Sequence, residues 1–171
     1  MRPLSVSFCD EGFPELFEFS VGRAAVVPAF QFVAVLAALL FTGAAIYINL
    51  VEHPARMSFG PHTAATVFGP SYRRAAVMQS GLALVATAAS VGVWLSGGAF
   101  VWLVGAVLIF MVIPVTLLVI APTNKRLLDP TLDRESTSAR KLLRTWGWLH
   151  AVRSVLGLLA SLMFLSALIW P

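Results

Sequence analysis

Four stretches of the chain are long and apolar enough to cross a lipid bilayer, and they limit the possible folds more than any other feature. They cover residues 26–51, 75–95, 99–121 and 146–170. A helix needs about 20 apolar residues to cross the hydrocarbon core. Of all residues 58% are hydrophobic and 12% are charged, whereas a soluble domain has about a quarter charged residues. The sequence therefore predicts an integral, multi-pass membrane protein.

The connections between these stretches predict how the helices pack. Residues 96–98, "SGG", join the second stretch to the third, so these two helices form a tight antiparallel hairpin. Small residues such as Ala45 and Ala86 recur in the spans, and close backbone approach holds helices together in lipid. The predicted fold is all-α, an antiparallel four-helix transmembrane bundle over residues 26–171, preceded by an N-terminal tail at residues 1–25.

Proline, glycine and serine predict where the helices end. Gly-Pro pairs at residues 60–61 and 69–70 predict a non-helical loop between the first two spans. Pro54 predicts that the first helix ends at the residue before it. Pro122 predicts the end of the third helix, and Ser136 predicts the capped start of the fourth.

The basic residues predict the orientation in the membrane. Only Arg2 and Arg23 lie on the side of the chain termini. Nine basic residues lie in the two long loops: Arg56, Arg73, Arg74, Lys125, Arg126, Arg134, Arg140, Lys141 and Arg144. The positive-inside rule places both long loops in the cytoplasm and both termini on the opposite side. Because orientation accounts for the net charge of +4, we expect the lipid bilayer and no nucleic acid as a partner.

Polar residues in the first span share one face of the predicted helix. At 100 degrees per residue, the following lie within about 40 degrees of one another: Gln31, Thr42, Asn49 and His53. Glu52 lies about 60 degrees to one side of this stripe. Polar groups on one face of a membrane helix normally point into the bundle or a cavity, so we predict that this stripe faces inward.

The fourth span has a matching stripe. Its members follow spacings of four, three, four and three: Trp146, His150, Arg153, Gly157 and Ala160. Arg153 lies about two turns into the span, where a guanidinium is costly without a partner. Glu52 and Arg153 are near the same predicted membrane boundary, so the sequence predicts an ion pair between them.

The second and third spans add polar groups at the same depth. Gln79 lies about one turn inside the boundary, while Asn124 and Arg126 follow the third span in "PTNKRLLD". Pro114 frees a backbone carbonyl within the third span and predicts a kink. These segments predict a polar cluster at the cytoplasmic side of the bundle.

Three motifs carry a family resemblance. They are "GAAIYINLVEHPAR" in the first span, "PTNKRLLD" after the third and "WGWLHAVRSVLGLLA" in the fourth. In order and spacing they resemble the anthrone-oxygenase-like family of small four-span membrane proteins, long catalogued as a domain of unknown function. The resemblance covers roughly residues 27–169. It implies oxidation of a lipophilic aromatic or quinone-type molecule, such as an anthrone, by molecular oxygen, with no obligatory metal or flavin.

That chemistry needs a base for a carbon-bound proton, donors for an enolate oxygen and an apolar slot. The resemblance implies His53 or His150 as the base, Asn49, Asn124 and Arg153 as donors, and Trp146 and Trp148 as slot walls. The candidate catalytic residues are therefore His53, His150, Arg153 and Glu52. The candidate substrate-binding residues are Asn49, Asn124, Arg126, Trp146, Trp148 and Gln79.

Other interpretations of the same residues stay open. His53, His150 and Glu52 would supply the two histidines and one carboxylate of a non-haem iron site, and His53 and His150 could hold a haem. Cys9 is the only cysteine, so neither an internal disulfide nor a cysteine-based metal site is expected. The polar residues could also be structural, in a non-enzymatic binding protein or accessory subunit. A transporter and a homo-oligomer are further alternatives.

Overall fold

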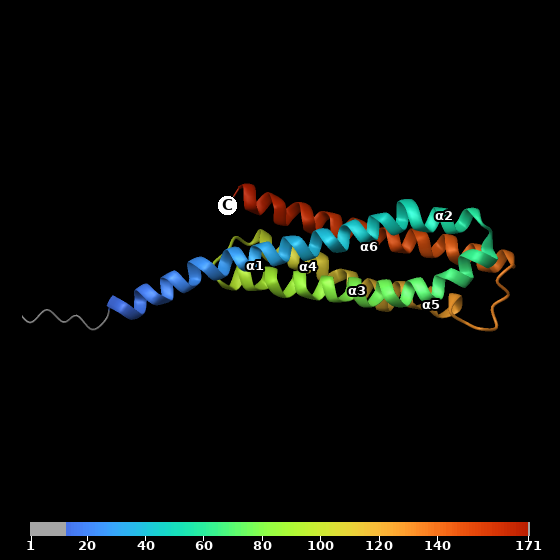
Figure 1. Cartoon of the computed structure of the whole chain (residues 1–171), viewed down its shortest axis with the longest axis horizontal. Coiled ribbons are helices and arrows are strands. Elements are labelled where there is room, and N and C mark those ends of the chain that lie inside the picture. Colours follow the sequence, from blue (N-terminus) through green and yellow to red (C-terminus); the bar gives the residue numbers. More distant parts are fainter. Residues whose placement is uncertain (1–12, 171) are drawn as a thin grey trace, which may run out of the picture.

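The protein is an antiparallel bundle of four long helical spans (Figure 1). The computed structural model describes the backbone of residues 13–170 and the side chains of residues 26–170. The helices are α1 (Phe13–Tyr47), η1 (Ile48–Glu52), α2 (His53–Ser58), α3 (Pro61–Leu95), α4 (Val101–Pro114), η2 (Val115–Ile120), α5 (Ala121–Leu127) and α6 (Thr137–Ile169). The spans long and apolar enough to cross a membrane are Val26–Ser58, Pro61–Leu95, Val101–Leu127 and Thr137–Ile169. The chain is therefore an integral, multi-pass membrane protein.

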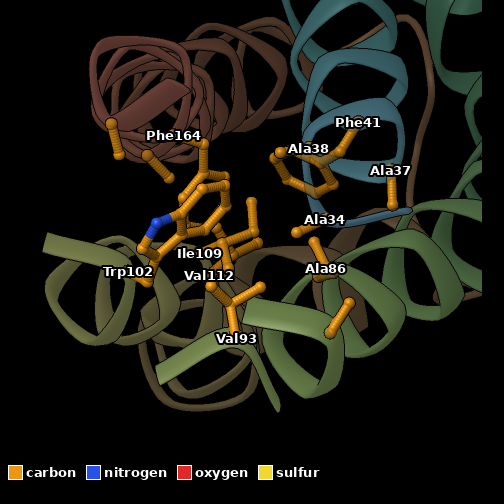
Figure 2. Packing of buried hydrophobic residues seen from close by; sticks show 14 of the residues in the cluster. Ala34, Ala37, Ala38, Phe41, Ala86, Val93, Trp102, Ile109, Val112 and Phe164 are labelled. Carbon is orange, nitrogen blue, oxygen red and sulfur yellow. The ribbon is translucent and has the colours of Figure 1, made fainter. Parts of the chain in front are cut away.

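Small side chains hold one part of the bundle together. Ala34, Ala38 and Ala86 are buried where α1 meets α3, as Figure 2 shows. Trp102 stacks on Phe164 with a centroid distance of 5.3 Å, and Gly105 leaves room for this ring because a Cβ there would overlap Phe164. In lipid the hydrophobic effect does not drive helices together, so they associate through close backbone approach at alanine and glycine.

A second buried cluster packs the opposite end of the bundle. It contains Ile48, Phe68, Leu127, Leu143 and Trp146. These residues come from η1, α3, α5 and α6, whose segments lie at the end of the bundle that also holds α2 (Figure 1). The candidate site lies at this end.

The first span does not end before Pro54, so that prediction is wrong. The helix passes through the π-helix η1, where the backbone N–H of His53 bonds to the carbonyl of Ile48, and α2 continues to Ser58. Pro54 lies in the first turn of α2, where its missing N–H and fixed φ cost little. The extra residue in the π-turn thus lets the chain absorb the proline and keeps His53 helical.

The first predicted loop is mostly helical. Gly60 has φ 89 and breaks the chain as expected, and Pro61 then starts α3. Pro70 lies inside α3 without ending it, so the predicted break at residues 69–70 is wrong. Phe68 in this stretch is fully buried, and its packing outweighs the proline's local preference.

The third span also continues past its predicted end. After Pro114 the chain becomes the π-helix η2, and Pro122 then occupies the first turn of α5, which ends at Leu127. Asn124 and Arg126 are therefore helical rather than in a loop. The prediction at Ser136 is confirmed, because its Oγ accepts a hydrogen bond from the Ala139 N–H at the start of α6.

Candidate functional site

Asn49 joins η1 to α6 through three hydrogen bonds. Its Nδ2 donates to the carbonyl of Gly147 at 2.9 Å. Its Oδ1 accepts from the Ser154 hydroxyl at 2.7 Å and lies 2.7 Å from Nδ1 of His150. The polar residues predicted for the first and fourth spans therefore meet in one network.

This network fixes the tautomer of His150. Because Oδ1 of Asn49 is an acceptor, Nδ1 of His150 must carry the proton that bonds to it. The other ring nitrogen, Nε2, is then the acceptor. His150 is 2% exposed, so one of its nitrogens is committed to holding η1 against α6 inside the bundle.

Arg153 has a different partner from the predicted one. Its Nη2 donates to Oε1 of Gln79 at 2.6 Å, and the two side chains are 5% and 1% exposed. Glu52 instead lies 3.5 Å from Nη1 of Arg56 and accepts from the Ser71 hydroxyl at 2.7 Å. The predicted Glu52–Arg153 ion pair is wrong, because Arg56 and Ser71 occupy the carboxylate on the α2 and α3 side.

Trp146 packs against both histidines of the cluster. Its ring centroid is 5.3 Å from that of His53 and 4.8 Å from that of His150. The guanidinium of Arg56 lies 5.6 Å from the same ring centroid, within the range of a cation–π contact. Trp146 is buried, so both histidines pack against its ring inside the protein.

Gly147 makes room for His53. A Cβ at residue 147 would lie 2.8 Å from Nε2 of His53 and 2.9 Å from its Cδ2. No real Cβ tolerates such a distance, so a side chain here would displace the imidazole. Gly147 was not among the predicted site residues, although it stands beside Trp146 in "WGWLH".

A groove of about 520 Å³ runs between the end of the first span and the start of α6. Its walls include Asn49, His53, Met57, Arg140, Arg144, Gly147 and Trp148. Trp148 is 79% exposed, and Arg140 and Arg144 are also exposed. Arg140 and Arg144 share one helix face with Gly147 and Ala151 at spacings of four, three and four, and this pattern could have identified them from the sequence.

A separate cavity lies inside the bundle and shares no lining residue with the groove. Its volume is about 10 Å³, which is near the minimum for a single water molecule. Its lining includes Arg56, Gln79, Trp146, His150 and Arg153. The polar cluster thus has two distinct spaces, an open groove beside His53 and a small cavity beside His150.

Two of the predicted site residues lie elsewhere. Arg126 is exposed and lines a surface hollow with Asp129 and Thr131. Asn124 is buried, and neither its amide nitrogen nor its amide oxygen has a hydrogen-bond partner. It lines neither the groove nor the internal cavity, because α5 carries it toward Tyr72 and Leu128.

The geometry also tests the metal alternative. Among the described residues, no three side chains of His, Cys, Asp and Glu lie close enough to hold a metal ion. Trp146 contacts both His53 and His150, while Glu52 bonds Ser71. Among the described side chains, His53, His150 and Glu52 therefore do not form a three-residue metal site.

Comparison with known proteins identifies the family. A family model described as anthrone oxygenase matches residues 68–163. The chain belongs to the anthrone oxygenase family. No curated protein matches it, and no solved structure does. The family assignment predicted from the three sequence motifs is thereby confirmed.

The anthrone oxygenase match covers only part of the polar cluster. It includes Gln79, Trp146, His150 and Arg153, which line the internal cavity. It begins after Asn49 and His53, which line the groove from the first span. The residues of the first span therefore enter the candidate site through their contacts with α6.

Proposed function

We propose that this membrane protein oxidises a lipophilic aromatic or quinone-type molecule with molecular oxygen in the groove between the first span and α6. The observation that carries the proposal is the position of His53 on the wall of a groove of about 520 Å³ in a member of the anthrone oxygenase family. Small-molecule sites typically have volumes of about 300–1,000 Å³. The groove has this size, whereas the internal cavity is far too small for a tricyclic molecule.

His53 is the proposed base. It is the histidine that lines the groove, and its Nε2 lies against Gly147, which also lines the groove. His150 is less suited to this role, because its Nδ1 bonds Asn49 and its ring lines the small cavity instead. Asn49 positions the two elements rather than binding substrate, since both ends of its amide already have partners.

The proposed reaction converts a CH₂ group beside aromatic rings into a carbonyl. His53 removes one proton and leaves an enolate, which Arg140 and Arg144 at the groove stabilise by their charge. The carbanion carbon gives an electron pair to dioxygen, and return of a proton gives a hydroperoxide. Loss of water from the hydroperoxide leaves the carbonyl, so one oxygen atom enters the product and the other leaves as water. The substrate itself supplies the electrons, and we propose that no metal or organic cofactor takes part.

Oxygen uptake tests this proposal. The protein is reconstituted in lipid nanodiscs, a model anthrone is added, and uptake is compared with that of empty nanodiscs to subtract spontaneous oxidation. His53→Gln is expected to lower the protein-dependent rate by about 10²–10⁴-fold, the usual contribution of a general base. His62→Gln is the matched control, because His62 is exposed and lies outside the groove. If wild type and empty nanodiscs consume oxygen at the same rate, the proposal is wrong.

A binding protein without catalysis is the second candidate. The observation that favours it is the complete set of bonds around Asn49, which ties η1 to α6 as a structural network would. Such a protein would bind the model anthrone, as seen by quenching of the exposed Trp148, without accelerating oxygen uptake. The nanodisc experiment therefore separates the two candidates.

We further propose that the groove opens near the cytoplasmic surface. The exposed Arg140 and Arg144 line the groove itself, and the positive-inside rule supports a cytoplasmic position for such residues. A lipophilic substrate dissolved in the bilayer would then reach the groove at the membrane boundary.

A further inference from the structure

Four nitrogen donors without hydrogen-bond partners lie on side chains that line the small internal cavity. They belong to the side chains of Arg56, Gln79, Trp146 and Arg153, each of which lines the cavity. The unpartnered atoms are Nε of both arginines, Nε2 of Gln79 and Nε1 of Trp146. All four side chains are more than nine-tenths buried. Buried donors of this kind normally have a partner, so their concentration around one cavity requires an acceptor.

The charge at the cavity is also unbalanced. Glu52 is the carboxylate nearest to this group, and it pairs with Arg56. Within residues 26–170 no carboxylate lies within ion-pair distance of Arg153, whose bonded partner is the neutral amide of Gln79. Arg153 also lies 5.7 Å from the centroid of the Phe41 ring, but an aromatic face does not carry a full negative charge. A buried charge without a counter-charge is strongly unfavourable.

We propose that this cavity binds a small monovalent anion of the halide class. The anion would accept hydrogen bonds from the unpartnered donors and supply the negative charge that Arg153 lacks. The volume of about 10 Å³ suits a single atom and excludes a polyatomic anion such as sulfate or gluconate. The site shares no lining residue with the groove, so it does not depend on the proposed oxidation.

The remaining polar groups of the lining are compatible with this ligand. The Ser71 hydroxyl donates to Glu52, so it offers no further donor to the cavity. His150 carries its proton on Nδ1 toward Asn49, which leaves one acceptor nitrogen, Nε2. The acceptors of the lining are Nε2 of His150 and the hydroxyl oxygens of Ser71 and Tyr72. They stand against four unpartnered donors, two of which belong to positively charged guanidinium groups, so the cavity favours an anion over a cation.

Thermal unfolding in different sodium salts tests the proposal. The protein in nanodiscs is heated in chloride, bromide or gluconate at one ionic strength, so that general screening is constant. Chloride and bromide are expected to raise Tm in a saturable way, by about 3–5 °C at ten times the dissociation constant. Equal Tm values in chloride and gluconate would overturn the proposal and leave water as the occupant.

A variant that places a carboxylate beside Arg153 tests whether the cavity needs an anion. In Gln79→Glu the new side chain is placed to accept from Arg153, since Oε1 of Gln79 already lies 2.6 Å from Nη2. This variant is expected to fold and to lose at least four-fifths of the halide-dependent rise in Tm. Gln31→Glu is the matched control, because Gln31 is partly buried and does not line the cavity; it should keep the full rise. A Gln79→Glu protein with the wild-type halide response would contradict the proposal.

Bromide also allows direct detection. Crystals of the wild-type protein grown in bromide should show an anomalous peak among Arg56, Gln79, Trp146 and Arg153, and crystals of Gln79→Glu should lack it. Density without an anomalous signal at this position in the wild-type protein would identify water and overturn the proposal. Neither measurement uses enzymatic activity, so failure of the proposed function leaves this test intact.

Discussion

Arg153 donates a 2.6 Å hydrogen bond from Nη2 to Oε1 of Gln79, and this bond links α6 to α3 inside the bundle. The guanidinium is thus held by a neutral amide, and the carboxylate of Glu52 pairs with Arg56 instead. Removal of either partner leaves a buried polar group unsatisfied, and hydrogen bonds to charged groups contribute about 1.5–3 kcal/mol. The pair is therefore expected to stabilise the packing of these two helices.

A double-mutant cycle checks this relationship. Arg153→Leu and Gln79→Leu are expected to interact by about 0.5–3 kcal/mol in the free energy of unfolding, because their side chains share one hydrogen bond. Arg153→Leu and Glu52→Gln serve as the control cycle and should add to within about 0.5 kcal/mol. Reversible unfolding of the reconstituted protein measures both cycles. Strong coupling of Arg153 to Glu52, with none to Gln79, would contradict the observed geometry.

The Asn49 network predicts a second effect on stability. Asn49→Ala leaves the donors of His150 and Ser154 without their common acceptor, and a buried donor without a partner costs about 1–3 kcal/mol. We expect the free energy of unfolding to fall by about 2–6 kcal/mol, on the basis of two such donors. Ser154→Ala removes one donor together with its need for an acceptor, so it should cost about 1 kcal/mol or less. Equal losses for the two variants, measured by unfolding, would show that Asn49 does not organise the network.

The sequence was sufficient for the fold because hydropathy and small residues act over whole spans. The inward stripe is confirmed at Thr42 and His53, both buried, and the Thr42 hydroxyl lies 3.0 Å from the hydroxyl of Ser161 across the bundle. The helix ends were less predictable, since Pro54 and Pro70 have strong local preferences that packing and a π-turn override. Whether a proline ends a helix depends on contacts that lie outside its own segment.

The sequence predicted most residues of the candidate site, but not which of them bond to one another. His150, Trp146 and Arg153 share the buried face of α6 that the spacing indicated. The helical wheel gives direction but not the neighbouring helix, so it could not show that Gln79 would reach Arg153 before Glu52 did. It also could not reveal the role of Gly147. The lack of a side chain there matters only because His53, from another helix, occupies the space.

Gly147→Ala tests the role of that missing side chain. The added Cβ would lie 2.8 Å from Nε2 of His53, so the imidazole must move away from its position on the groove wall. Overpacking of this kind costs about 1–3 kcal/mol, and we expect both a lower Tm and a loss of protein-dependent oxygen uptake. Gly43→Ala is the matched control, because a Cβ there meets no atom within 4 Å. Normal uptake by Gly147→Ala would place the base elsewhere than at His53.

The proposed orientation predicts which loops react from outside the cell. In a Cys9→Ser background the chain has no other cysteine, so single cysteines can be placed at exposed Ala99, in the turn between α3 and α4, and at exposed Thr131, between α5 and α6. A membrane-impermeant maleimide should label Ala99→Cys in intact cells and Thr131→Cys only after permeabilisation, because the basic residues cluster at the end of the bundle that carries Thr131. Labelling of Thr131→Cys in intact cells would reverse the orientation and place the groove on the outer side of the membrane.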